Sequence, residues 1–189
     1  MGDIRLKKHP FEYGGKAYEL SVNMNVLADL QELHDGNLNA VLLKGRTMKT
    51  VFEIAAAAMN DYADSKGWPE RVTAKELGRT LGMSGFKRLC EPMMDMLIAA
   101  IKEPDDSEPE EEKKREDHGD EPYSVNFPWF LNIWINILHN DETVFWRTMT
   151  PARCVSLYRE YFELIAPRRT SKDEETSKPS LHDYIAGVG

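Results

Sequence analysis

The first twenty-two residues alternate between apolar and polar positions, which is typical of a β-hairpin. A Gly14-Gly15 pair divides the alternation and can supply the positive φ angles of a tight turn. The alternating apolar positions are Phe11, Tyr13, Tyr18, Leu20 and Val22. Because proline donates no ladder hydrogen bond, His9-Pro10 predicts a first strand that lies at an edge or starts late.

After Val22 the apolar residues no longer alternate with polar ones but recur every three or four positions, the spacing of an amphipathic helix. It predicts helices over 26–33, 38–43, 47–62, 74–81 and 84–101. Thr47 and Ser84 are suitable N-caps, and Thr73 with Glu76 forms a capping-box pattern. Pro92 is expected to kink or split the last helix. The prediction is an α+β, mainly α, fold in which an N-terminal hairpin precedes a small helical bundle.

A second group of helical patterns begins at Asn126, a suitable N-cap with Pro128 in the first turn. Its wide apolar face consists of Phe127, Phe130, Ile133, Trp134, Ile137 and Leu138. Thr150-Pro151 then predicts the start of another helix, since threonine caps helices and proline is favoured at the first helical position. These two helices form a small C-terminal module.

The net charge of −8 is concentrated between the two predicted groups of helices, which indicates that a linker separates them. Residues 103–122 contain eleven acidic and three basic residues, a difference that equals the whole net charge. That stretch has no aliphatic or aromatic residue, so it predicts a disordered acidic linker. An acidic tract that mimics nucleic acid or binds basic partners is the alternative. The predicted organisation is a first domain over 1–102, the linker over 103–122, the module over 123–167 and a mobile tail over 168–189.

The C-terminal module has more aromatic surface than a unit of its size easily buries. Its side chains either form a core against the first domain or provide a docking surface for a partner. The candidate partner-binding residues are Trp129, Phe130, Ile133, Trp134, Ile137, Phe145, Trp146, Thr150 and Pro151. A group of methionines at 83, 93, 94 and 96 leaves the same two alternatives, core filler or adaptable binding surface.

Signatures of catalysis are missing from the sequence. No glycine-rich phosphate loop occurs, and the five histidines have no metal-ligand spacing, so we expect no catalytic residues, cofactor or metal. Neutral helical regions beside an acidic linker predict no nucleic-acid partner. The longest apolar run, Ile54–Met59, is too short to span a membrane, and Cys90 and Cys154 fit a reducing cytoplasm.

Two stretches resemble a known family. FEYGGKAYELSVNMNVLADLQELHDGNLNAVL, residues 11–42, resembles the start of the tail assembly chaperones of long-tailed bacteriophages. DETVFWRTMTPARCVSLY, residues 141–158, resembles the Phe-Trp…Thr-Pro motif of the downstream extension in the long form of those proteins, whose short form is the first domain alone. The resemblance implies a non-catalytic chaperone that forms homo-oligomers through the first domain, residues 1–102. It would bind the tape-measure protein, recruit tail-tube subunits in the bacterial cytoplasm and leave before the virion is complete.

Three other functions remain open at this stage. A structural tail or virion-completion protein would stay in purified particles, where a chaperone is absent. A host cytosolic adaptor or regulator would bind host proteins or promoter DNA, although the charge distribution argues against DNA. An enzyme with an active site built from distant positions is the last alternative.

Overall fold

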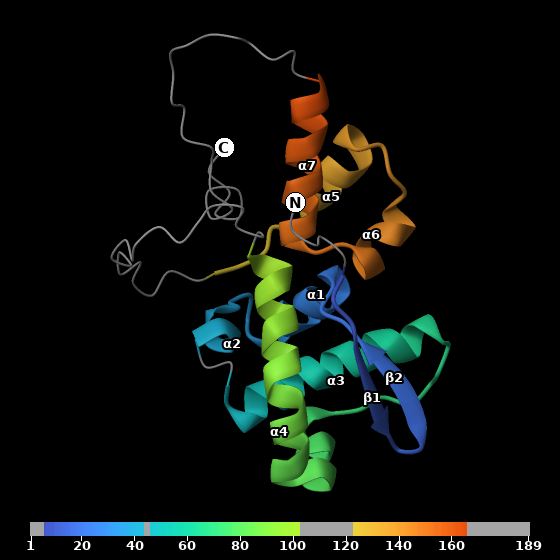
Figure 1. Cartoon of the computed structure of the whole chain (residues 1–189), viewed down its shortest axis with the longest axis vertical. Helices are drawn as coiled ribbons and strands as arrows, with labels where there is room; N and C mark the ends of the chain where they lie inside the picture. Colours follow the sequence, from blue (N-terminus) through green and yellow to red (C-terminus); the bar gives the residue numbers. More distant parts are fainter. Residues whose placement is uncertain (1–5, 44–45, 103–122, 166–189) are drawn as a thin grey trace.

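The computed structural model describes residues 6–43, 46–102 and 123–165, and these are mainly helical behind an N-terminal hairpin (Figure 1). The predicted fold class is therefore confirmed. In chain order the elements are β1 (His9–Tyr13), β2 (Lys16–Leu20), α1 (Met24–Leu33), α2 (Asn39–Leu43), α3 (Met48–Ser65), α4 (Ala74–Ile101), α5 (Phe127–Asn132), the π-helix η1 (Ile133–Ile137), α6 (Glu142–Thr148) and α7 (Pro151–Ile165). The linker predicted at 103–122 and the tail predicted at 168–189 lie outside the described residues.

The hairpin forms where the alternation predicts it. β1 and β2 are antiparallel, and Phe11 lies opposite Tyr18, with both side chains buried. Gly14 and Gly15 have φ angles of 59° and 74°, the positive values that a two-residue turn between right-twisted strands requires. The first strand begins at His9, which confirms the late start predicted from the His-Pro step.

Polar caps fix the starts of α1 and α3. The Asn23 side chain accepts a hydrogen bond from the Val26 amide, and the Thr47 hydroxyl accepts one from the Thr50 amide. Most of the apolar face predicted for α1 is buried, but Leu33 is 58% exposed. The pattern was wrong there because α1 ends at this residue and the next one, His34, makes the contact with Glu53 of α3.

The two helices predicted at 74–81 and 84–101 are the arms of one kinked helix, α4. The capping box at its start is confirmed, since Thr73 and Glu76 each bond the other's backbone amide. The kink lies at Gly82, where φ is 55° and ψ is −147°, whereas Pro92 lies inside the helix without a break. The split that the sequence allowed at Pro92 does not occur, whereas the interruption predicted between helices 74–81 and 84–101 is confirmed. Buried Leu89, Met93 and Met96 hold that part of α4 against the core although proline removes one helical hydrogen bond.

We predict that Gly82→Ala lowers the free energy of unfolding by about 1–3 kcal/mol. A Cβ atom at Gly82 would meet nothing within 4 Å, so the cost comes from a backbone conformation that L-residues rarely adopt. Gly78→Ala in the same helix is the control. Its Cβ would lie 3.6 Å from the Phe52 ring, an ordinary contact, and alanine gains up to about 1 kcal/mol of helix propensity. Urea denaturation distinguishes the two variants, and equal losses would contradict the assignment of strain to Gly82.

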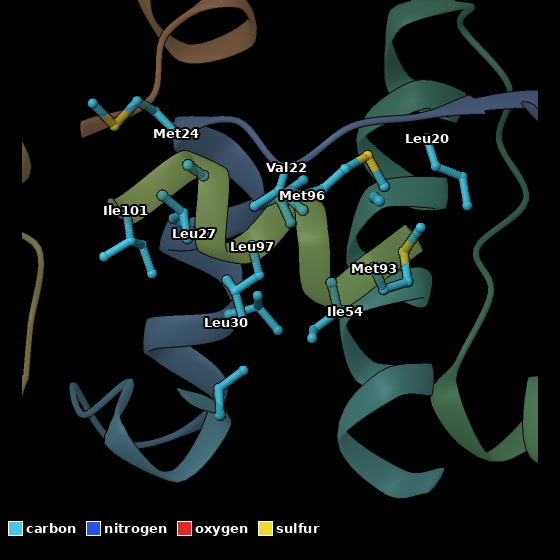
Figure 2. Packing of buried hydrophobic residues seen from close by; sticks show 14 of the residues in the cluster. Leu20, Val22, Met24, Leu27, Leu30, Ile54, Met93, Met96, Leu97 and Ile101 are labelled. Carbon is cyan, nitrogen blue, oxygen red and sulfur yellow. The ribbon is translucent and has the colours of Figure 1, made fainter. Parts of the chain in front are cut away.

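The second arm of α4 runs through the centre of the core (Figure 2). Met93, Met96, Leu97 and Ile101 lie among side chains of α1, α3 and the segment that follows β2. Of the methionines that the sequence left open, 93, 94 and 96 are therefore core residues, and Met83, beside the kink, is 57% exposed. The buried methionines fill irregular space around a kinked helix, for which their flexible side chains are suited.

The C-terminal module packs on the first part of the chain. One cluster of buried side chains extends from Phe11 in β1 to Val155 in α7. α6 contacts α1, and the N-terminal end of α7 lies beside the C-terminal end of α4 (Figure 1). The predicted helix after Asn126 is also more complex than its pattern, because α5 widens into the π-helix η1, and α6 had not been predicted.

Candidate functional site

The candidate partner-binding residues of the C-terminal module divide into a buried group and a half-buried group. The buried candidates are Phe130, Ile133, Trp134, Phe145, Thr150 and Pro151. The half-buried candidates are Trp129, Ile137 and Trp146. The buried group therefore bears out the first alternative drawn from the composition, a core against the rest of the chain. The first group forms core, and only the second offers surface that a partner can contact.

The caps that start α5 and α7 hold this module in place. The Asn126 side chain accepts a hydrogen bond from the Trp129 amide, with Pro128 in the first turn as predicted. The Thr150 hydroxyl accepts one from the Arg153 amide at 3.2 Å, which confirms the predicted start of α7 at Pro151. Both residues of the Thr-Pro pair are buried, so their role in the structure is to begin the helix.

Aromatic contacts connect the buried group to the half-buried group. Phe145 contacts Trp146 edge-to-face at 5.1 Å and Trp134 at 6.4 Å between ring centroids, and Trp129 contacts Phe130 edge-to-face at 4.9 Å. The Trp134 indole N–H donates to the Asp141 carbonyl at 2.8 Å, which satisfies its only polar atom. The buried rings thus fix the positions of the half-exposed indoles.

Cys154 lies under this cluster as a core residue. Its thiol is buried beside the Phe130 carbonyl, and burial raises its pKa to about 12. Because the thiolate is the reactive form, a thiol with this pKa is inert at neutral pH. Cys90 in α4 is half-buried, and the described residues contain no disulfide.

Hydrogen bonds to backbone atoms join the two parts of the chain, in addition to the apolar side chains of their shared core. The Met24 amide donates to the Met149 carbonyl at 2.9 Å, and the Asn23 side chain donates to the Arg147 carbonyl at 3.2 Å. Asn23 also donates to Asp61 of α3 at 2.7 Å. The start of α1, the C-terminal part of α3 and the end of α6 with the residue that follows it therefore meet at one place.

A second set of bonds lies at the other end of α1. The Val125 amide donates to the Gln31 side chain at 2.6 Å, and the same side chain donates back to the Val125 carbonyl at 3.4 Å. The Leu38 amide donates to the Tyr123 carbonyl at 2.7 Å. Residues 123–125 thus lie beside the C-terminal end of α1 and the loop that leads to α2. We refer to the two sets of bonds together as the junction.

Carboxylates gather on α1 and α3 beside the junction. Partial burial, followed by the charges of Asp61, Glu32 and Asp64, raises the pKa of Asp29, and nearby Arg71 opposes the shift. Asn25 donates to Asp61 at 2.7 Å, so that carboxylate is held by both asparagines of the α1 start. Around the end of α1, His34 Nε2 lies 3.3 Å from Glu53 Oε2. Sequence spacing gave no signal for this contact because His34 follows α1 whereas Glu53 belongs to α3.

We predict that Asp29→Asn raises the free energy of unfolding at pH 7, by up to about 0.5 kcal/mol. The raised pKa means that the charged carboxylate opposes folding, and this cost disappears as the pH falls below the pKa and the group is protonated. The gain should therefore vanish near pH 3. Asp95→Asn on α4 makes the same change of charge at an exposed position and is the matched control. Urea denaturation across this range tests both, and a gain from Asp29→Asn that persists at pH 3 would contradict the prediction.

The largest exposed apolar side chains of the module are on α6 and α7. Val144 is 45% exposed, Phe162 46% and Leu164 86%. Phe162 contacts Tyr158 edge-to-face at 4.6 Å, which orients its ring on the surface of α7. Phe162 belonged to the predicted apolar face of this helix, whereas nothing in the helical pattern marked Leu164.

Within the described part of the chain, no group of three or more histidine, cysteine or carboxylate side chains is placed to hold a metal ion. None of the described helices is long and apolar enough to cross a membrane. Comparison of the chain with protein families, with curated proteins and with solved structures finds no match. A functional conclusion therefore depends on the two resembling stretches and on the surface that the module presents.

Proposed function

We propose that this chain is a non-catalytic tail assembly chaperone of a long-tailed phage or prophage, in the long form with the downstream extension. The observation that supports the proposal is where the two resembling stretches lie. Residues 11–42 and 141–158 are far apart in sequence, yet they meet at the junction through the Met24–Met149 and Asn23–Arg147 bonds. The family resemblance thus concerns two surfaces that fit each other, which is expected if both stretches derive from one ancestral protein.

The proposed partners are the tape-measure protein and the tail-tube protein, which the chaperone binds in the cytoplasm of the bacterial host and leaves before the virion is complete. Client contact is assigned to Trp129, Ile137 and Trp146, because these candidates retain exposed surface. Half-exposed tryptophans held by buried neighbours are suitable anchors, since a rigid ring loses little conformational freedom on binding. The buried candidates act indirectly, by positioning these side chains.

Co-purification tests the proposal. The tagged full chain is expressed with the genes that flank its own, and the proteins recovered with it are identified by mass spectrometry. We expect a long helical tape-measure protein or a tail-tube subunit. Trp129→Ala and Trp146→Ala should each lower its recovery at least tenfold, with circular dichroism confirming that the variants fold. Trp68→Ala is the matched control, because Trp68 is a half-buried tryptophan packed on Tyr18 in the first part of the chain.

Purified particles distinguish the alternatives. A chaperone is absent from them, whereas a structural tail or virion-completion protein remains. Recovery of host proteins alone would favour a host adaptor. If Trp129→Ala and Trp146→Ala both recover the client as well as the unaltered chain does, the assignment of client contact to these residues is wrong.

A further inference from the structure

A cleft lies between the start of the hairpin and one face of α4. Its volume is about 400 Å³, within the range of about 300–1,000 Å³ that is usual for small-ligand pockets. One wall consists of residues 7–9, and the other belongs to the second arm of α4, between Glu91 and Met96. None of the lining residues belongs to the C-terminal module, so the proposed function makes no use of this cleft.

The α4 wall carries two parallel rows of side chains. Glu91 and Asp95 are one helical turn apart, and so are Pro92 and Met96, so a row of carboxylates runs beside a row of apolar side chains. Because Pro92 has no amide hydrogen, the Arg88 carbonyl one turn earlier also lacks its helical partner. Hydrogen-bond acceptors beside apolar surface suit a cation on an aliphatic stem.

The opposite wall carries positive charge. Lys8 Nζ bonds Glu19 of β2 at 2.6 Å, which leaves Lys7 as the cation that this wall offers to a ligand. Partial burial, followed by the charge of Arg88, lowers the pKa of His9, so its imidazole is uncharged at neutral pH. His9 therefore contributes hydrogen-bonding atoms rather than charge.

The charges on the two walls do not pair with each other. Within the part of the chain that the structure describes, no ion pair joins Lys7 to Glu91 or Asp95. All three side chains line the cleft and belong to exposed residues. A ligand with a cationic group at one end and an anionic group at the other can therefore pair with both walls at once.

We propose that this cleft binds arginine with a free carboxyl group, either as the C-terminal residue of a polypeptide or as the amino acid. The guanidinium group lies between Glu91 and Asp95, because its planar fork of donors can bond two carboxylates. The ligand carboxylate pairs with Lys7, and the aliphatic stem covers Pro92 and Met96. The inference concerns a small-ligand site and does not depend on the proposed function.

Nuclear magnetic resonance titration of the isotope-labelled full chain tests the proposal. The probe is Nα-acetyl-L-arginine, which carries both charged groups. We expect it to shift the amide signals of residues 7–9 and of the α4 residues around Pro92, with a Kd in the low millimolar range. Nα-acetyl-L-citrulline lacks the cation and should bind about tenfold more weakly, and Nα-acetyl-L-argininamide lacks the carboxylate and should bind about threefold more weakly, as expected for exposed ion pairs.

Substitutions at exposed positions assign the two ends of the ligand. Glu91→Gln and Asp95→Asn should each weaken binding of acetylarginine about threefold. Glu12→Gln is the matched control, because Glu12 is an exposed residue of β1 outside the cleft. Lys7→Gln should also weaken acetylarginine about threefold but leave argininamide binding unchanged, since that probe has no carboxylate for Lys7 to pair with.

Two further ligands identify the source of the arginine. An acetylated glycyl-glycyl-arginine peptide should bind at least as tightly as acetylarginine if the cleft takes the C-terminus of a polypeptide. Free L-arginine should bind more tightly than both if the cleft takes the amino acid.

Three results would overturn the proposal. The first is acetylarginine that leaves the signals of the cleft unshifted at about 20 mM, well above the expected Kd. The second is citrulline that binds as tightly as arginine. The third is Glu91→Gln and Asp95→Asn chains that bind acetylarginine as tightly as the unaltered chain. None of these readouts involves a tail protein, so a failure here and a failure of the proposed chaperone function are distinguishable.

Discussion

Phe145→Ala is expected to lower the free energy of unfolding by about 3–5 kcal/mol, a large share of the total stability of a domain of this size. Phe145 is fully buried, and its ring contacts both Trp134 and Trp146. Removing the ring loses the free energy of its burial and leaves a cavity that neighbouring indoles fill only in part. Denaturant unfolding followed by tryptophan fluorescence measures the change.

Val144→Ala is the matched control for this substitution. Val144 precedes Phe145 in α6 but is 45% exposed, so the loss of its side chain should cost no more than about 0.5 kcal/mol. Equal costs would mean that α6 is not packed as described. The two substitutions also show how binding experiments should be interpreted. Phe130→Ala, Trp134→Ala and Phe145→Ala each remove a buried ring, so a loss of client binding in these variants would reflect unfolding of the module. Trp129 and Trp146 are therefore the informative positions for client contact.

Local chemistry made the hairpin and most helix starts predictable from the sequence. These features depend on residues within a few positions of one another, so the local sequence is sufficient to predict them. They are the Gly14-Gly15 turn, the Thr73–Glu76 capping box and the Thr150-Pro151 helix start. The helical spacing also predicted the interruption between residues 81 and 84, where Gly82 has its non-helical φ and ψ angles. Pro92 is a strong local signal for a second interruption, but the core contacts of its neighbours outweigh it.

The candidate site was less predictable because it depends on long-range contacts. An excess of aromatic surface can be read from composition, but the division into buried and half-buried rings depends on how the module meets the first part of the chain. Gln31 and Val125 are separated by 94 positions, and Asn23 and Arg147 by 124. Several of the groups that bond there are backbone atoms, which every residue has, so no pattern of side chains marks them.

Deleting everything after residue 102 is expected to destabilise the remaining chain more than any single substitution described above. The amides of Met24 and Leu38 and the Gln31 side chain would lose their partners, at about 0.5–1.5 kcal/mol for each hydrogen bond. Side chains at the ends of α1 and α4 that the module covers, such as Met24 and Ile101, would also become exposed. Against a typical total of about 5–15 kcal/mol, these losses leave residues 1–102 marginal. Thermal unfolding followed by circular dichroism measures the difference.

A chain that ends after residue 166 is the control, since it keeps every described contact of the module and should unfold with the full chain. If residues 1–102 unfold at the same temperature as both longer chains, the junction contributes nothing to stability. The expected result also constrains the proposed function. If a short form of the chaperone consists of the first domain alone, as the family resemblance implies, its α1 face has no module of its own. A stable short form then requires a partner on that face.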